Sequence, residues 1–398
     1  MKVICDRQAL LAAVNAVASV VPARSPTPAL SCLKLAAAKA GSAGELLISG
    51  SDGDTSLQLS LTQVDIAQPG SAVVPADKLR QIVAAVESEP TITLEIEGEV
   101  CHIKATRSRF KIFAYPADQF PQLAEMPAAT GTGPGAARSI FTHTAGALLT
   151  LVNRTVFATA RETSRYAING VLLKRDGKKL EMVATDGRRL AVSRAALKSA
   201  AGGESGPTAC IIPSKALNLV QRLAGSPDEQ VRVAVTDNRA FFAFEEAGEG
   251  KKGDPRPRAI LSSSLVEGAF PPYEDVIPKD QDKKVSAHRD ELAMAIREAS
   301  ILTNEESRGV RMSFSGKSKK LKLTSRAPEM GESEIDVPLE GYEGEDLEIS
   351  FNPQFITDAL KAIDETEVII ELKAPNRPGL LKAGADFLYV VMPVNLPN

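Results

Sequence analysis

The chain has 398 residues, of which 43% are hydrophobic and 24% are charged, and its net charge is −3. This length suits two to three ordinary domains, and the composition excludes a largely disordered chain. The net charge argues against a protein coated in nucleic acid, and the four cysteines lack the spacing of a metal site or a disulfide framework. No apolar run approaches about 18 residues and an acid stands at position 6, so we expect no membrane span, no signal peptide and a cytoplasmic protein.

Three copies of one pattern of predicted elements follow one another along the chain. In each copy an apolar helix start precedes a second helix, which begins at Pro75, Pro213 or Asn352. The interval from Leu10 to Pro75 and from Leu148 to Pro213 is 65 residues, and the three second-helix starts lie 138 and 139 residues apart. Mostly apolar residues follow each start at helical spacing. A repeat of this size is a whole domain, so the sequence predicts three similar domains in tandem.

Short runs of β-forming residues flank the two helices of each copy, which predicts an α+β domain with both helices packed on antiparallel sheet. The Asp-Gly pairs at 52 and 186 suit two-residue hairpin turns of type I′. Residues 127–137 are rich in Gly, Pro, Ala and Thr and are typical of a linker, whereas the charged residues 245–258 predict an exposed loop. We therefore expect domains over residues 1–126, 138–277 and 278–398.

Basic residues gather on the two predicted helices of the second copy, residues 144–161 and 214–224, which contain no acid at all. These basic residues are Arg154, Arg161, Lys215 and Arg222. Acids dominate elsewhere, as in residues 340–348, so the pattern favours one face turned toward a polyanion. Four basic residues on two helices are also compatible with a plain solvated surface. With 5% aromatic residues and no tryptophan, any nucleic-acid contact should be electrostatic and independent of base sequence.

Motifs for catalysis are weak. Residues 309–318 end like a phosphate-binding loop, but six residues separate the two glycines where that loop has four. Residues 51–54 resemble part of a calcium loop without its later glutamate, and the three histidines have no metal-ligand spacing. We expect a non-enzyme with no metal and no cofactor. A hydrolase with a dispersed site and a protein-only scaffold that displays peptide grooves are the alternatives.

Five segments, taken in order, resemble the bacterial DNA polymerase III beta subunit, the sliding clamp. They are RETSRYAINGVLL (161–173), VATDGRRLAVSR (183–194), FPPYEDVIP (270–278), NEESRGVRM (304–312) and YVVMPVNL (389–396). The resemblance covers essentially the whole chain, including the triplication. It implies a DNA clamp fold that forms a head-to-tail homodimeric ring around duplex DNA, with helices lining the hole and sheets outside. As a processivity factor, such a ring tethers the replicative polymerase, the clamp loader and repair proteins through short peptides.

The resemblance also carries a partner groove onto this sequence, position by position. Its residues are Ile168, Thr185, Gly187, Arg188, Arg189, Leu190, Pro271, Val276, Asn352, Phe355, Pro378, Val390, Val391, Met392 and Pro393. An apolar groove with a few polar groups suits a short peptide that ends in a leucine-aromatic pair. From the pattern alone, Leu190, Val276 and Val391 could equally be core residues. Ser307 and Asp275 depart from relatives that carry an aromatic and a base there.

Two further sets of residues follow from the resemblance and from the predicted helices. We expect sequence-independent contacts with duplex DNA through Arg24, Arg80, Arg154, Tyr166, Lys215, Arg222 and Arg297. The resemblance implies that the first domain of one chain meets the third domain of another through Phe110, Ile112, Ile301 and Leu302. Such head-to-tail pairing covers sheet edges that would otherwise stay open.

Overall fold

The computed structural model describes residues 1–40, 43–131, 133, 135–160, 167–197, 207–245, 257–303, 309–327 and 330–395. The predictions made for Tyr166, Arg161, Ser307 and most of the loop at 245–258 therefore lie outside the described residues. Contacts group the chain into two compact units. The N-terminal unit comprises Met1–Leu149, Leu197–Gly206 and Lys215–Leu265, and the C-terminal unit comprises Thr150–Ala196, Pro207–Ser214 and Val266–Asn398.

The N-terminal unit is built on two antiparallel sheets. The order of the five-stranded sheet is β5 (Val64–Gln68), β1 (Lys2–Asp6), β7 (Thr91–Glu97), β8 (Val100–Lys104) and β9 (Arg109–Phe113). The order of the eight-stranded sheet is β10 (Ser139–Thr144), β15 (Gln230–Val235), β16 (Arg239–Glu245), β17 (Pro257–Ser264), β4 (Thr55–Leu61), β3 (Ala43–Ser51), β2 (Cys32–Ala40) and β6 (Gly70–Pro75). The pairing of β17 with β4 joins the central copy to the first one, with Leu261 opposite Leu57.

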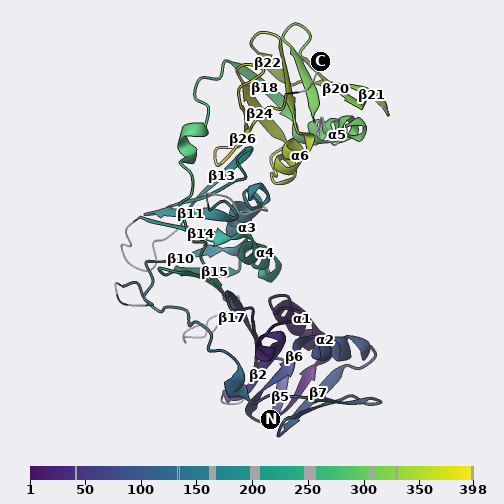
Figure 1. Cartoon of the computed structure of the whole chain (residues 1–398), viewed down its shortest axis with the longest axis vertical. Coiled ribbons are helices and arrows are strands. Elements are labelled where there is room, and N and C mark those ends of the chain that lie inside the picture. The colour runs from purple at the N-terminus through teal and green to yellow at the C-terminus, as the bar shows by residue number, and fades with distance from the viewer. Residues whose placement is uncertain are drawn as a thin grey trace. The chain divides into compact units, whose positions relative to one another are not determined.

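Helices α1 (Arg7–Ala18) and α2 (Ala76–Ala85) pack against each other in this unit (Figure 1). The side chain of Asp6 caps α1 by accepting a hydrogen bond from the Ala9 amide at 2.8 Å. Leu10, Val14 and Val17 are fully buried, at the helical spacing that the sequence predicts, and α1 lies on β3 and β4. The helices of the central copy are α3 (Ala145–Asn153) and α4 (Ser214–Leu223).

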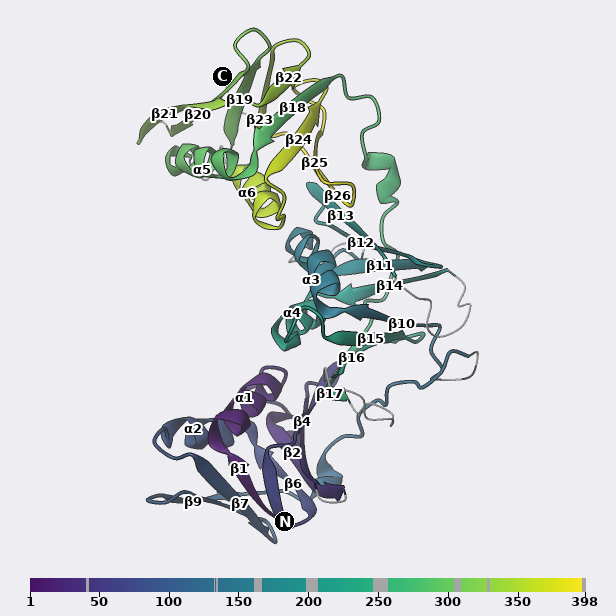
Figure 2. The same cartoon turned by 180° about the vertical axis from the view of Figure 1, so that it is seen from behind.

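The C-terminal unit is also built on two antiparallel sheets. Its nine-stranded sheet runs β14 (Thr208–Pro213), β11 (Gly170–Asp176), β12 (Lys179–Thr185), β13 (Arg189–Ala196), β26 (Phe387–Val391), β25 (Gly379–Ala383), β24 (Glu367–Leu372), β18 (Lys283–His288) and β22 (Gly341–Glu343). Its four-stranded sheet runs β21 (Gly331–Pro338), β20 (Lys320–Ala327), β19 (Val310–Ser315) and β23 (Leu347–Phe351). Helices α5 (Arg289–Ala299) and α6 (Pro353–Lys361) pack together, and α5 also lies on β20 and β21 (Figure 2).

Short 3₁₀ turns complete the chain at η1 (Pro28–Ser31), η2 (Ala117–Gln119), η3 (Val156–Ala158), η4 (Tyr273–Val276) and η5 (Ser300–Leu302). The predicted α+β pattern of two helices on antiparallel sheet is confirmed, and the second helices begin at or just after the three predicted starts. The helix predicted over 144–161 is too long, because α3 ends at Asn153. There the hydroxyl of Thr155 donates to the Leu151 carbonyl at 2.7 Å, which competes with continued helix.

Candidate functional site

The turn that follows β12 places two arginines at one edge of the C-terminal unit. The hydroxyl of Thr185 accepts from the Gly187 amide at 3.1 Å and donates to the Arg189 carbonyl at 2.7 Å. Oδ1 of Asp186 accepts from the amides of Arg188 and Arg189 at 3.0 and 3.1 Å. Gly187 has φ +84°, a conformation that disfavours any residue with a Cβ. The loop has four residues between the paired Thr185 and Leu190, so it is a hairpin turn as predicted but longer than type I′.

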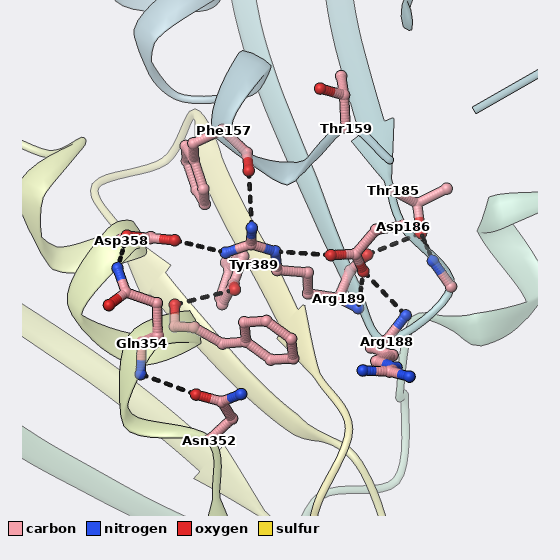
Figure 3. A network of polar contacts seen from close by, with 12 residues as sticks. Phe157, Thr159, Thr185, Asp186, Arg188, Arg189, Asn352, Gln354, Asp358 and Tyr389 are labelled. Carbon is pink, nitrogen blue, oxygen red and sulfur yellow. Dashed lines mark hydrogen bonds and ion pairs between the residues drawn. The ribbon is translucent and has the colours of Figure 1, made fainter. Parts of the chain in front are cut away.

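Arg189 is the centre of a polar network at this turn (Figure 3). Its Nε donates to Asp186 at 3.0 Å, and its two terminal nitrogens donate to Asp358 and to the Phe157 carbonyl, each at 2.8 Å. The guanidinium also lies over the Phe355 ring, 4.5 Å from its centroid. Burial lowers the pKa of Arg189, but the hydrogen bond to Asp358 together with the interactions with Tyr389 and Asp186 outweighs it, and the net shift is upward. The network therefore holds a permanent cation between β13 and α6.

Pairing of β13 with β26 places Leu190 opposite Val390 and creates an apolar pocket of about 220 Å³. The pocket is lined by Ile168, Thr185, Gly187, Arg188, Arg189, Leu190, Pro271, Pro272, Tyr273, Val276, Val390 and Met392. All but two of these residues were predicted as groove residues. Leu190 is 2% exposed at the bottom, whereas Val276 and Met392 are 53% and 43% exposed. We call this site the apolar pocket.

Pro272 and Tyr273 were missed by sequence reasoning. The Tyr273 ring is buried, and its hydroxyl donates to Glu181 at 2.5 Å and accepts from the Lys174 ammonium at 3.0 Å. Burial and the neighbouring Glu181 raise the pKa of Tyr273 above its usual range. An aromatic residue directly after two prolines between two strands was the available signal, because such a rigid segment holds its side chain in place.

A second, more polar cavity of about 1070 Å³ shares Arg188 and Arg189 with the apolar pocket. Asn352 and Phe355, both predicted groove residues, line this cavity. Asn352 also caps α6 by accepting from the Gln354 amide at 3.0 Å. The predicted groove is thus divided between two adjoining cavities.

Three predicted groove residues, Pro378, Val391 and Pro393, line neither cavity. The prediction that Val391 lines the groove is wrong, because its side chain is 2% exposed. Neighbouring residues of a strand point to opposite faces, so Val391 faces away from the pocket that Val390 lines. The interpretation as core is therefore right for Val391. It is wrong for Val276, which is largely exposed.

The prediction that Arg154 contacts duplex DNA is also wrong, because its side chain is not exposed to a phosphate. Its side chain is 8% exposed, and one terminal nitrogen donates to both carboxylate oxygens of Glu365, each at 2.8 Å. The guanidinium lies over the Phe387 ring, 5.6 Å from the centroid. Burial raises the pKa of Glu365, but its hydrogen bonds, including that from Arg154, shift it downward overall. Because α3 ends at Asn153, Arg154 turns into the unit and not outward.

The other predicted DNA contacts that the structure describes are exposed: Arg24, Arg80, Lys215, Arg222 and Arg297. Two of them have acidic partners, since Arg80 pairs with Asp77 at 3.0 Å and Lys215 donates to Asp52. Burial raises the pKa of Asp52, yet the hydrogen bonds from Lys215 and the amides of Thr55 and Asp54 prevail and lower it. These cations lie where a polyanion could reach them.

Two of the predicted dimer residues lie on an edge strand, and the other two lie in a 3₁₀ turn that contacts the edge strand β21. Phe110 and Ile112 are half-buried on β9, an edge strand of the five-stranded sheet. Ile301 is 73% exposed in η5, and Leu302 beside it is half-buried. Met330 and Phe113, at 63% and 76% exposure, add further apolar surface that the sequence reasoning did not include. Contact between these two sets remains a prediction.

Within the described residues, no group of three or more His, Cys, Asp or Glu side chains is placed to hold a metal ion. No helix in that part of the chain is both long and apolar enough to cross a membrane.

Three family models match successive parts of the chain. They are the N-terminal domain of the DNA polymerase III beta subunit at residues 1–124, its central domain at 144–272 and its C-terminal domain at 274–395. The beta sliding clamp of Pseudomonas aeruginosa is 33% identical over 393 residues, which cover 98% of this chain and 99% of that protein. The beta sliding clamp of Escherichia coli K12 is 31% identical, with full coverage of both chains.

Solved structures agree with these matches. The DNA polymerase sliding clamp of Bacillus subtilis superposes with a TM-score of 0.87 at 25% identity, and the P. aeruginosa sliding clamp bound to griselimycin with 0.86 at 32% identity. Each match covers 100% of both chains. The fold therefore defines a DNA clamp built from three tandem α+β domains. The chain belongs to the family of the bacterial DNA polymerase III beta subunit, and its function is that of a sliding clamp, the processivity factor of the polymerase.

Proposed function

We propose that this sliding clamp closes around duplex DNA as a head-to-tail homodimer and performs no chemistry of its own. The replicative polymerase, the clamp loader and repair proteins attach by short peptides whose apolar anchors enter the apolar pocket. The observation that carries the proposal is this pocket, with buried Leu190 and Val390 at its base and exposed Val276 and Met392 at its rim. We infer a cytoplasmic location, where a bacterial chromosome lies.

The pocket suits a peptide that ends in leucine and an aromatic residue. Each buried anchor contributes roughly 1.5–3 kcal/mol, so two or three anchors support micromolar binding after the cost of association. Met392 is unbranched and adaptable, which suits successive partners with different anchors. The exposed cation of Arg188 adjoins the apolar lining and orients the peptide.

Calorimetric titration with such a peptide tests the pocket. We expect deletion of residues 392–398 to abolish binding, and Met392→Glu to weaken it at least tenfold, because a carboxylate enters an apolar lining. Met294→Glu is the matched control, since Met294 is 56% exposed on α5 and lines neither cavity. Unchanged affinity in an assembled ring that carries Met392→Glu would place the partner site elsewhere.

For the duplex we propose contacts through Arg24, Arg80, Lys215, Arg222 and Arg297, which are exposed. Lys215 and Arg222 share α4, so their double change to Gln removes two charges from one helix. We expect the slope of log affinity against log salt to become shallower by about 1 to 2, and retention on DNA to fall at moderate salt. Lys320→Gln, an exposed change on β20, is the control. An unaltered slope would contradict the basic lining.

For the ring we propose that β9 of one chain meets the edge formed by β21 and η5 of its partner. Exposed Arg109 and Lys111 on β9 are opposite in charge to Glu332, Glu334 and Asp336 of β21, which also pair with cations of β20 within their own sheet. The double change Ile301→Asp and Leu302→Asp should give monomers in sedimentation, because it introduces charge into an apolar interface. Met294→Glu should remain a dimer. A dimer with both charged substitutions would refute the assignment.

A further inference from the structure

The larger cavity, which adjoins the apolar pocket, exposes cations that its own acids do not neutralise. Arg188, Arg297 and Lys361 line it, and all three are exposed. Among the described residues, none of these three side chains has an ion pair within 4.0 Å. We call this site the basic cavity. Its positive charge stands out because the whole chain is acidic, with a net charge of −3.

The two acids of the basic cavity, Asp186 and Asp358, are already engaged. Both pair with the single guanidinium of Arg189. The second oxygen of Asp186 accepts the amides of Arg188 and Arg189, and that of Asp358 accepts the Gln354 side-chain amide at 2.5 Å. Each of their oxygens already accepts at least one hydrogen bond in this network, and neither carboxylate is ion-paired with Lys361 or with the Arg188 side chain. The cations therefore remain open to a ligand.

The remaining lining of the basic cavity has hydrogen-bonding groups suited to an extended peptide. The hydroxyls of Ser300, Thr303 and Thr357 already donate to backbone carbonyls, so they offer oxygens that can accept from peptide amides. Asn352 offers a side-chain amide nitrogen that can donate. The cavity and the apolar pocket share Arg188 and Arg189, so they adjoin each other at these two residues. A peptide anchored in the apolar pocket and extended past Arg188 enters the basic cavity.

We propose that the basic cavity binds acidic side chains of the partner peptide, next to the residues that fill the apolar pocket. This inference rests on the proposed peptide function of that pocket. Phe157, Phe355 and Pro353 give the cavity apolar walls beside its cations, which suits a single peptide strand that enters a concavity. A duplex presents a convex backbone and reaches only rim charges. Acidic peptides are therefore the favoured occupant, and duplex phosphate is the competing outcome of the test.

The test compares two synthetic peptides that share a terminal leucine and phenylalanine. One carries two glutamates before this anchor and the other carries two glutamines. Fluorescence anisotropy with the full-length ring at low salt should show the acidic peptide binding about fivefold more tightly, since each exposed ion pair contributes only a few-fold. In the double variant Arg188→Gln and Lys361→Gln this ratio should fall to nearly one. The glutamine peptide should keep its affinity, which also shows that the variant is folded.

A matched variant with Lys178→Gln and Lys179→Gln, two exposed lysines at the hairpin between β11 and β12, removes the same charge outside the basic cavity and should keep the fivefold ratio. A ratio of one in the unaltered ring would overturn the inference while the apolar pocket stands. A fivefold ratio that persists in the Arg188 and Lys361 variant would place acid recognition elsewhere. Lower duplex affinity in that variant, with an unchanged peptide ratio, would assign the cavity to DNA. If neither peptide bound the unaltered ring, the proposed peptide function itself would fall.

Discussion

Two hairpin turns of this clamp have the same local structure and different surroundings. The first turn is Ser51–Thr55 and the second is Thr185–Arg189. In each, the opening hydroxyl accepts from the glycine amide, at 3.0 and 3.1 Å, and donates to the carbonyl four residues on. In each, Oδ1 of the aspartate accepts two backbone amides, and the glycine has positive φ, +101° and +84°.

The two turns differ in the partner of the second carboxylate oxygen of their aspartate. Asp52 and Asp186 are equally exposed at 19%, but Asp52 pairs with Lys215, which is 55% exposed, and Asp186 pairs with Arg189, which is 10% exposed. Lys215 therefore stays available to solvent and to a polyanion. Arg189 is fixed by a second acid and two aromatic rings, at the edge of the apolar pocket. One turn motif thus supports a surface cation in the first case and a buried structural cation in the second.

The largest expected difference comes from removing each cation. Arg189→Met leaves Asp186 and Asp358 close together without a counter-charge, and we expect it to lower the free energy of unfolding by about 2–4 kcal/mol. Lys215→Met breaks an exposed pair and should cost less than about 1 kcal/mol. Urea denaturation of the two variants measures both values. Equal losses would show that the second network is no more structural than the first pair.

The two glycines give a matched pair of intermediate size. A Cβ at Gly53 or Gly187 meets no atom within 4 Å, so only the positive φ opposes alanine. We expect Gly53→Ala and Gly187→Ala each to lower stability by about 1–2 kcal/mol. Only Gly187→Ala should also weaken peptide binding, because Gly187 lines the apolar pocket. Thermal unfolding and anisotropy check these outcomes. A loss of peptide affinity in Gly53→Ala would argue against the separation of the two turns.

A smaller effect is expected when Asp52 loses its charge. Asp52→Asn keeps the oxygen that accepts the turn amides but releases Lys215 from its ion pair. Affinity for duplex DNA at low salt should rise about two- to fivefold, since an exposed pair is worth less than about 1 kcal/mol. Binding of a fluorescent duplex measures the change. An unchanged or weaker affinity would mean that Lys215 does not contact phosphate.

The smallest effect concerns pH. The pKa of Asp52 is lowered from its usual 3.8, so the carboxylate stabilises the fold fully above about pH 4 and loses this contribution as pH falls through the lowered pKa. Because Lys215 is a main cause of the shift, Lys215→Met should move the pKa back upward. NMR titration of the carboxyl carbon follows this directly. An Asp52 pKa that is insensitive to the substitution would assign the shift to the backbone amides.

Much of the fold could be predicted from the sequence. The repeated starts at Pro75, Pro213 and Asn352 and the Asp-Gly turns are local signals, and helices and hairpins form there. Residue patterns alone predicted less of the site than of the fold. Leu190 and Val390 meet only because β13 pairs with β26, and no local spacing encodes a pairing between strands almost 200 residues apart. Tyr273 joins them from η4, a third segment of the chain. The family resemblance supplied most of these residues, and it still missed Tyr273.

The charged residues also show which features the sequence determines and which only the tertiary structure decides. The sequence by itself determined that the second copy carries basic residues near its helices. It also determined that the side chains of the two Asp-Gly turns bond to the backbone of the same turn. Both features depend only on neighbours in the chain. Only the tertiary structure decided the role of each cation. Arg154 and Lys215 have the same charge, yet Arg154 meets Glu365 in a buried site and Lys215 remains at the surface. The physical reason is that desolvation and pairing depend on which distant segments pack around a side chain.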